Sequence, residues 1–157
     1  MPEWMKWTAP AAAVVSLTSA AHAVQYLSVA QAQKLAFPSA TQFVEVQAGR
    51  AWKAESGGKV IGLFVFDHVI GKHLYIDYTV ALDPTGRVLR VDILQYRESY
   101  GGEVRQASWL AQFVGKTSAS QLTVDQDIRN ISGATLSSHH VTEGIKRILA
   151  FYDVCLK

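Results

Sequence analysis

The sequence predicts an α+β domain: an antiparallel sheet with a short N-terminal helix and a C-terminal helix packed on it. Three observations lead to this expectation. Alternating or continuously apolar runs fill the middle of the chain, a turn sequence joins two of them, and the last segment has apolar residues at helical spacing. Because strand follows strand with no long helix between them, antiparallel pairing is favoured over a series of β-α-β units.

The first elements follow from local signals. Residues 29–36 should form a short helix, because Ser28 can cap it with a hydroxyl oxygen and Pro38 cannot continue it. A possible strand follows at residues 44–53. Residues 59–70 are nearly all apolar, which is typical of a strand covered on both faces.

Residues 74–82 and 88–96 alternate between apolar and polar side chains, as half-buried strands do. The sequence Asp-Pro-Thr-Gly at residues 83–86 lies between them and favours a tight turn, so the two strands should pair as a hairpin. Residues 106–113 could form a short helix. The final helix is predicted by an apolar stripe that comprises Val141, Ile145, Ile148, Leu149 and Tyr152.

The chain should contain one globular domain behind a secretory signal. With 157 residues, 49% of them hydrophobic and 18% charged, it can bury a sizeable core. Lys6, the apolar and small residues 7–20 and the Ala-His-Ala site that ends at Ala23 are typical of a signal peptide over residues 1–23. We therefore expect a domain of residues 24–157 that is periplasmic or otherwise exported, the alternative being an uncleaved amphipathic leader.

Charge and cysteine content exclude several classes of function. A net charge of +2, with no basic cluster longer than a dipeptide, argues against nucleic acid as a partner. Cys155 is the only cysteine, so the chain alone cannot build a disulfide framework, a structural zinc site or an iron–sulfur cluster. A lone thiol of this kind is inert or forms an intermolecular bridge. His139 and His140 point about 100° apart on a helix and are poorly placed to share a metal ion, so no metal site is predicted.

Residues 130–138 place small and hydroxyl side chains at the entrance of the last helix. The first turn of a helix has unpaired N–H groups and the positive end of the helix dipole, so it binds anions well. Gly133 and Ala134 allow a ligand to approach the backbone closely. No acidic residue precedes Glu143 in this helix, although acids are common in a first turn. The pattern indicates a site for an exogenous anion such as phosphate.

The sequence Ser132-Gly133-Ala134-Thr135 also resembles a known family. It is similar to the FMN-binding domain found in the C subunit of the sodium-pumping NADH:quinone reductase and in the G subunit of the Rnf complex. Residues 96–104, which include Glu98 and two glycines, and the segment from Trp109 to Lys116 resemble further parts of that domain, so the similarity spans about residues 60–149. One departure is Arg129, since the family usually has Asp three residues before the motif's Ser.

The resemblance implies that Thr135 carries FMN through a phosphoester made by a dedicated flavin transferase. The alternative is a helix-entry threonine that only satisfies backbone donors. Ser132 and Ser137 either donate to the phosphate or ribityl oxygens or cap the helix. Leu136 completes the motif.

Outside the motif, each candidate has a structural alternative. Glu98 would meet the ribityl chain or the polar edge of the isoalloxazine, or else be a solvated charge. Tyr100 and Trp109 would form a flat apolar wall for the flavin, or belong to the core. Lys116 would place a positive charge near the cofactor, or be an ordinary exposed lysine.

These features predict an exported flavoprotein with covalent FMN that relays electrons between membrane or periplasmic redox proteins, such as quinone reductases and cytochromes. There is no nicotinamide-binding fingerprint and no evident substrate acid or base, so an electron carrier is expected rather than an enzyme with its own substrate. The alternative from another class is a secreted α+β binding module that holds a small anion or a partner protein noncovalently at the same helix entrance.

Overall fold

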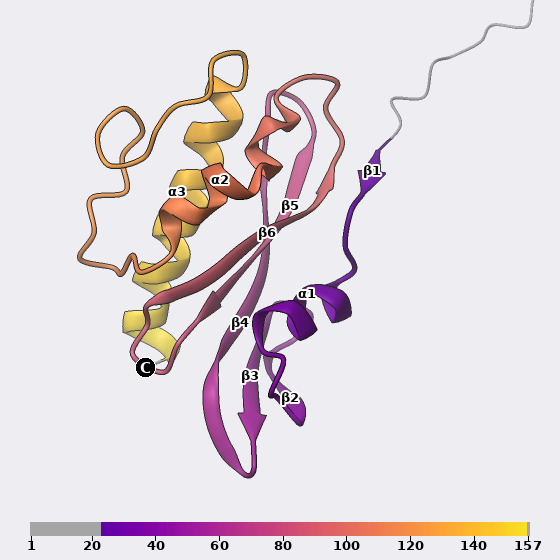
Figure 1. Cartoon of the computed structure of the whole chain (residues 1–157), viewed down its shortest axis with the longest axis vertical. Coiled ribbons are helices and arrows are strands. Elements are labelled where there is room, and N and C mark those ends of the chain that lie inside the picture. Colours follow the sequence, from indigo (N-terminus) through magenta and orange to yellow (C-terminus); the bar gives the residue numbers. More distant parts are fainter. Residues whose placement is uncertain (1–22, 157) are drawn as a thin grey trace, which may run out of the picture.

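A six-stranded antiparallel sheet forms the centre of the molecule in the computed structural model, which describes residues 23–156 (Figure 1). The strand order is β1-β6-β5-β4-β3-β2, so that all neighbours except β1 and β6 are also consecutive in sequence. The strands are β1 (Val24–Gln25), β2 (Gln42–Gln47), β3 (Ala51–Ser56), β4 (Lys59–Ile70), β5 (Tyr75–Leu82) and β6 (Val88–Tyr96).

Helices cover both faces of this sheet. The longest helix, α3 (Thr135–Phe151), lies on one face, and α1 (Val29–Ala36) lies on the other (Figure 1). The short segments η1 (Gly102–Arg105), α2 (Ala107–Leu110) and η2 (Ala111–Phe113) follow β6, and η3 (Tyr152–Leu156) follows α3. The expected α+β class, with a short N-terminal helix and a C-terminal helix on an antiparallel sheet, is confirmed.

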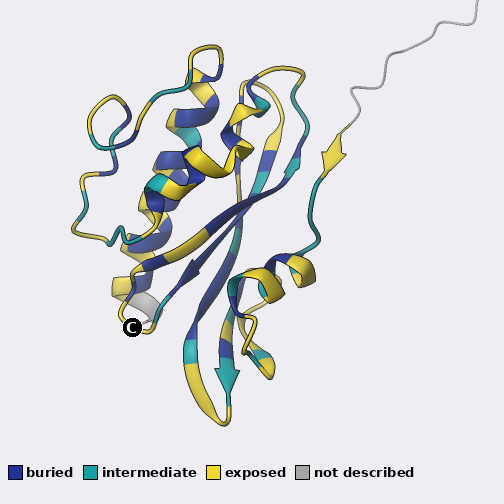
Figure 2. Cartoon of the chain, in the orientation of Figure 1, coloured by how far each residue is buried: buried dark blue, intermediate teal, exposed yellow. Residues whose placement is uncertain are grey.

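Strand β4 separates two hydrophobic cores. Leu63 and Val65 belong to the core beneath α3, whereas Phe64, between them, packs in the core beneath α1. Side chains alternate across a strand, so a strand buried on both faces must be apolar at successive positions. This explains the continuous apolar run, and the middle of β4 is buried as predicted (Figure 2).

Several local predictions are confirmed. Ser28 caps α1, and Gln31 completes a reciprocal capping box in which its side chain accepts from the Ser28 N–H at 2.8 Å. Strands β5 and β6 pair as the expected hairpin. The predicted stripe, which lies on α3 and ends at Tyr152 in η3, is buried, with no residue of it more than 5% exposed.

Two predicted elements are wrong in detail. The single strand expected at residues 44–53 is two strands, because the chain reverses at residues 48–50. Gly49 adopts a left-handed conformation with φ +64°, and the Arg50 N–H donates to the Gln47 carbonyl at 3.0 Å. The helix expected at residues 106–113 is divided into α2 and η2.

The predicted signal peptide lies outside the described residues except for Ala23, and the side chain of Cys155 lies outside them too. In residues 23–156 no helix combines the length and the apolar character needed to cross a bilayer.

Candidate functional site

The entrance of α3 is open, as the sequence predicted. The helix begins at Thr135 after Ala134, no side chain caps it, and its first turn contains no acid. The Ser138 N–H makes a helical hydrogen bond, to the Ala134 carbonyl at 2.9 Å. The three N–H groups before it, of residues 135–137, have no hydrogen-bond acceptor within the described part of the chain. They form the unpaired donor set that a helix start offers to an anion.

A pocket of about 280 Å³ lies over this entrance. Its lining comprises Lys72, Tyr100, Gly101, Gly133, Ala134, Thr135, Leu136 and Ser137. Thr135 is exposed, so its hydroxyl is accessible. Gly133 has φ +85°, and a Cβ built there would meet nothing within 4 Å, so its backbone is open to a ligand. Ser132 is exposed just before Gly133 but does not line the pocket.

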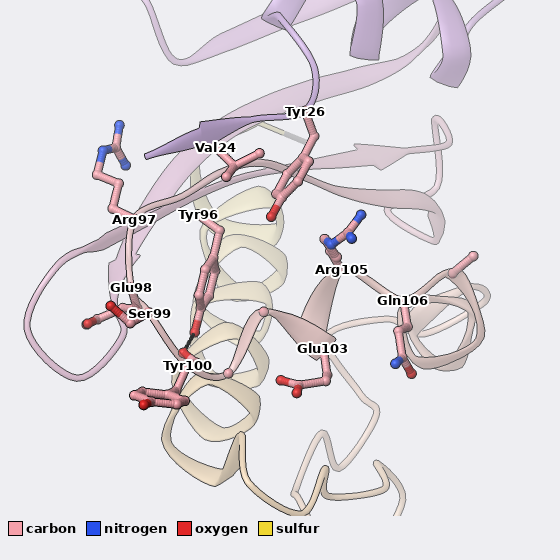
Figure 3. Close-up of a pocket in the computed structure, with 13 residues that line it drawn as sticks. Val24, Tyr26, Tyr96, Arg97, Glu98, Ser99, Tyr100, Glu103, Arg105 and Gln106 are labelled. Atoms are coloured by element: carbon pink, nitrogen blue, oxygen red, sulfur yellow. Dashed lines mark hydrogen bonds between the residues drawn. The ribbon is translucent and has the colours of Figure 1, made fainter. Parts of the chain in front are cut away.

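Tyr96, at the end of β6, joins the following loop to the helix entrance. Its hydroxyl donates to the Tyr100 carbonyl (Figure 3). The same hydroxyl lies 3.0 Å from the Ser137 hydroxyl. A Cβ on Gly101 would lie 2.5 Å from the Tyr96 hydroxyl and 2.9 Å from that of Ser137, so only glycine fits this contact. Ser137 is therefore buried and holds the loop, while the Tyr100 side chain is 87% exposed at the pocket.

A larger pocket of about 770 Å³ adjoins the first and shares Tyr100 and Gly101 with it. Tyr26, Glu98 and Arg105 also line it (Figure 3). Its volume is in the range of small-molecule sites. Together the two pockets offer a polar, cationic end at α3 and a wider space beyond Tyr100.

Glu98 is neither a free charge nor a simple pocket-lining group. Its Oε1 accepts hydrogen bonds from the N–H groups of Lys72 at 2.7 Å, His73, and Leu74 at 2.7 Å. Desolvation acts to raise the pKa of Glu98, but these backbone donors outweigh it and hold the pKa below its ordinary value. Glu98 is thus the internal anion of the β4–β5 turn, a role that the sequence pattern did not indicate.

The same turn is tied to α3 from its other side. His140 Nδ1 contacts the carbonyl oxygens of Ile70 and Gly71, the latter at 2.9 Å. Both partners are acceptors, so Nδ1 carries a hydrogen. Held by Glu98 and His140, the turn places Lys72 in the pocket with Thr135. Lys72 was not predicted, because only the pairing of β4 with β5 and the packing of α3 bring it there.

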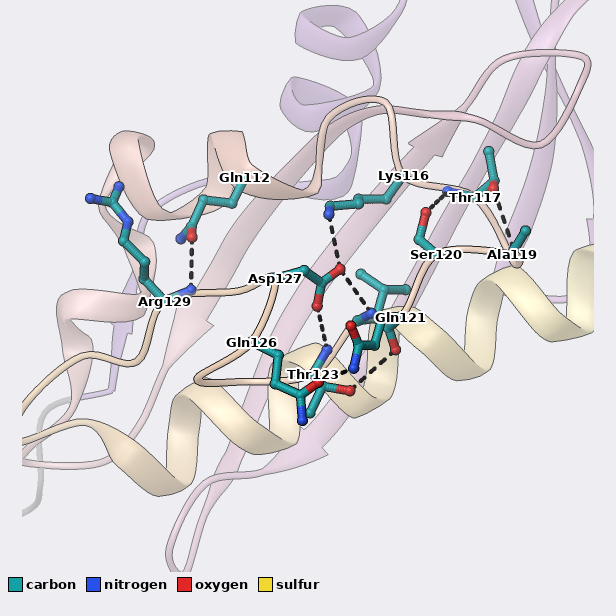
Figure 4. A network of polar contacts seen from close by, with 11 residues as sticks. Gln112, Lys116, Thr117, Ala119, Ser120, Gln121, Thr123, Gln126, Asp127 and Arg129 are labelled. Atoms are coloured by element: carbon teal, nitrogen blue, oxygen red, sulfur yellow. Dashed lines mark hydrogen bonds and ion pairs between the residues drawn. The ribbon is translucent and has the colours of Figure 1, made fainter.

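The structure places Lys116 far from the pocket at the start of α3. Its ammonium lies 2.9 Å from an Asp127 carboxylate oxygen (Figure 4). Its backbone carbonyl accepts from the Val88 N–H at the start of β6, whereas Glu98 and Tyr100 follow the end of that strand. Nine residues of strand separate the two ends by roughly 25 Å.

Asp127 organises the segment that leads to the motif. Its carboxylate also accepts from the N–H groups of Leu122 at 3.0 Å and Thr123 at 2.7 Å (Figure 4). Desolvation raises its pKa, but the hydrogen bonds from Thr123, Lys116 and Leu122 dominate and lower the pKa to about 2. Lys116 therefore supports this segment through an ion pair.

Trp109 is a core residue rather than a wall of the pocket. It is 4% exposed and packs edge-on against Phe113, with ring centroids 5.1 Å apart. Its indole N–H donates to the Arg129 carbonyl at 2.7 Å, and Gln112 accepts from the Arg129 N–H at 2.8 Å. The backbone is thus fixed immediately before the motif, while the Arg129 side chain is exposed.

Asn130 is a further residue that the sequence pattern did not single out. Its side-chain nitrogen lies 3.4 Å from Thr135 Oγ1. Its side-chain oxygen is buried and has no hydrogen-bond partner among the described residues.

The donor set fits a phosphorylated ligand. Unpaired helix N–H groups and a lysine recognise phosphate, an accessible threonine hydroxyl lies among them, and an exposed aromatic side chain borders the wider pocket. Fold and site therefore define an α+β domain with an open helix entrance whose unpaired donors suit an anionic ligand.

The profile of the FMN-binding domain family matches residues 71–150, from the turn that carries Lys72 almost to the end of α3. The chain is also 30% identical, over 145 residues, to the G subunit of the proton-translocating ferredoxin:NAD(+) oxidoreductase complex of Clostridium ljungdahlii (strain ATCC 55383 / DSM 13528 / PETC). That alignment covers 86% of this chain and 78% of the relative. The chain belongs to the FMN-binding domain family, and the resemblance seen in its motifs is confirmed.

Proposed function

We propose that this protein is an exported electron-transfer flavoprotein with FMN attached covalently to Thr135. The observation that carries the proposal is the exposed Thr135 hydroxyl at the first position of an uncapped helix, in a chain of the FMN-binding family. The clostridial relative belongs to a ferredoxin:NAD(+) oxidoreductase complex, which supports electron transfer as the role and membrane or periplasmic redox proteins as the partners.

Different residues of the chain would bind different parts of the cofactor. The N–H groups of residues 135–137 would donate to the phosphate oxygens, and the Lys72 ammonium would balance the remaining charge. Tyr100 would offer a flat surface to the ring system. FMN supplies the one- and two-electron chemistry when bound, and the fold fixes its place and surroundings.

Attachment requires a flavin transferase and FAD. Thr135 Oγ would form a bond to the flavin-side phosphorus, the pyrophosphate P–O bond would break, and AMP would leave with the bridging oxygen. The hydroxyl proton passes to a base of the transferase or to solvent, and nothing is oxidised or reduced. A covalent link prevents loss of the cofactor from an exported protein.

The test is the intact mass of denatured protein made with a flavin transferase and FAD. The wild type should carry the added mass of one FMN phosphoester, Thr135→Ala should carry none, and Thr135→Ser should load in part. The Ala variant should still fold, because losing a helix-entry hydroxyl costs about 1 kcal/mol. Covalent flavin on the Ala variant would move the attachment to Ser132 or Ser137. An unloaded wild type would favour the anion-binding module.

Export is a second part of the proposal. Lys6, the apolar and small residues 7–20 and the Ala-His-Ala site that ends at Ala23 support cleavage after Ala23. N-terminal sequencing of the protein from the producing cells should give Val24 as the first residue. Protein that retains Met1 in membrane fractions would contradict cleavage.

A further inference from the structure

The amide nitrogen and the amide oxygen of the Asn130 side chain have different surroundings. One end faces Thr135, with the amide nitrogen 3.4 Å from Oγ1. The other end, the amide oxygen, is buried without a hydrogen-bond partner within residues 23–156. If the amide is flipped, its oxygen lies beside Thr135 and its nitrogen is the buried atom without a partner. One polar atom is therefore unpaired in either orientation.

An unpaired buried polar atom weakens the fold, so its presence calls for an explanation. An apolar side chain of similar size would avoid the loss. The neighbouring backbone holds the asparagine in this position, because Trp109 and Gln112 bind the carbonyl and the N–H of Arg129. What the asparagine gains is its contact with the Thr135 hydroxyl.

We infer that Asn130 is a positioning residue that orients the Thr135 hydroxyl for covalent attachment of FMN, an inference that rests on the proposed function. A threonine at the start of a helix has more than one χ1 rotamer open to it. An amide beside Oγ1 selects one of them, and it can accept from the free hydroxyl or donate to the ester oxygen. Asn130 itself neither gains nor loses a proton when the Thr135 O–P bond forms and AMP leaves.

The experiment measures the rate of flavin loading by a purified flavin transferase and FAD, followed by intact mass, together with the thermal midpoint of unfolding. Asn130→Leu should lower the loading kcat about tenfold and change KM for the acceptor protein less than twofold. Its thermal midpoint should be unchanged or higher, since the unpaired buried atom is gone. Gln126→Leu, at an exposed amide of the same connection, is the matched control and should load like the wild type.

A double-mutant comparison separates positioning from a structural role. If Asn130 acts through Thr135, then Asn130→Leu and Thr135→Ser should affect loading non-additively, by at least threefold. Wild-type loading by Asn130→Leu, a lower thermal midpoint with proportionate loss of loading, or additive effects would each overturn the inference. If Asn130→Leu does not fold, Asn130→Ala is judged by the same measurements. Absence of loading in the wild type would overturn the proposed function, and the inference with it.

Discussion

Two sets of backbone N–H groups, one in the turn that brings Lys72 to the pocket and one at the helix start that lines it, differ in their hydrogen-bond partners. In the β4–β5 turn, the N–H groups of residues 72–74 all donate to one carboxylate oxygen of Glu98. At the start of α3, the N–H groups of residues 135–137 receive no side chain from the described chain. The first set already holds an internal anion, whereas the second would receive the FMN phosphate under the proposed function.

The difference shows that the open helix entrance does not reflect a lack of acidic side chains in this region. Asp127 closes a third set, the N–H groups of Leu122 and Thr123, within the segment that leads to the motif. Internal carboxylates thus satisfy these two sets, whereas no side chain of the described residues caps the N–H groups at the start of α3, where Thr135 is exposed. Four substitutions test this contrast between closed and open donor sets.

The largest effect should come from opening the closed set. Glu98→Ala removes the anion from three donors and should lower the free energy of unfolding by about 2 kcal/mol, because hydrogen bonds to charged groups are the strong ones. Urea denaturation at pH 7 measures this. Glu103→Ala, at an exposed acid in the same loop, is the control and should be near neutral. Equal stability of the two variants would contradict the capping role of Glu98.

An acid placed beside the unpaired N–H groups of α3 should have a smaller effect. It should raise the stability of the fold and weaken the binding of FMN. Leu136→Glu places an acid in the first turn of α3 at a side chain that is 50% exposed. It should raise stability by about 0.5 kcal/mol and weaken noncovalent FMN binding by about 1 kcal/mol, roughly fivefold. Fluorescence titration of protein made without a transferase measures the affinity. Leu136→Gln is the control for size, and riboflavin, which lacks the phosphate, should show little difference between variants.

The third set predicts a pH dependence. The pKa of Asp127 is about 2 in the folded protein, below its ordinary value of 3.8. Its stabilising contribution is therefore complete above about pH 4 and is lost as the pH falls toward 2. Urea midpoints measured between pH 2 and 6 should fall less steeply for Asp127→Asn than for the wild type. A slope for Asp127→Asn equal to that of the wild type would contradict the prediction.

The smallest effect is expected at Arg129, the departure from the family pattern. Its side chain is exposed, so Arg129→Asp should change stability by less than about 0.5 kcal/mol. Because it restores the family's usual acid, the flavin-loaded fraction measured by intact mass should be preserved or increased. A collapse of loading would show that Arg129 has a role of its own, such as a bidentate contact with phosphate.

Local sequence signals predicted the elements that depend on neighbouring residues. The cap at Ser28, the β5–β6 hairpin and the buried stripe of α3 follow from spacing that the chain expresses within a few residues. The turn at residues 48–50 was not predicted because the apolar side chains continue through β2 into β3, and Gly49 alone marks the reversal.

The order of residues alone specifies that α3 starts at small and hydroxyl residues without an acid, and it therefore indicates an anion site at Thr135. What surrounds that site depends on the folded chain. Glu98 meets a turn more than twenty residues earlier, and Lys72 meets a helix start more than sixty residues later. Such contacts depend on strand register and helix packing, and no local pattern encodes them. For the same reason Lys116 and Trp109, although nearer to the motif in sequence than Lys72, serve the ion pair with Asp127 and the core instead.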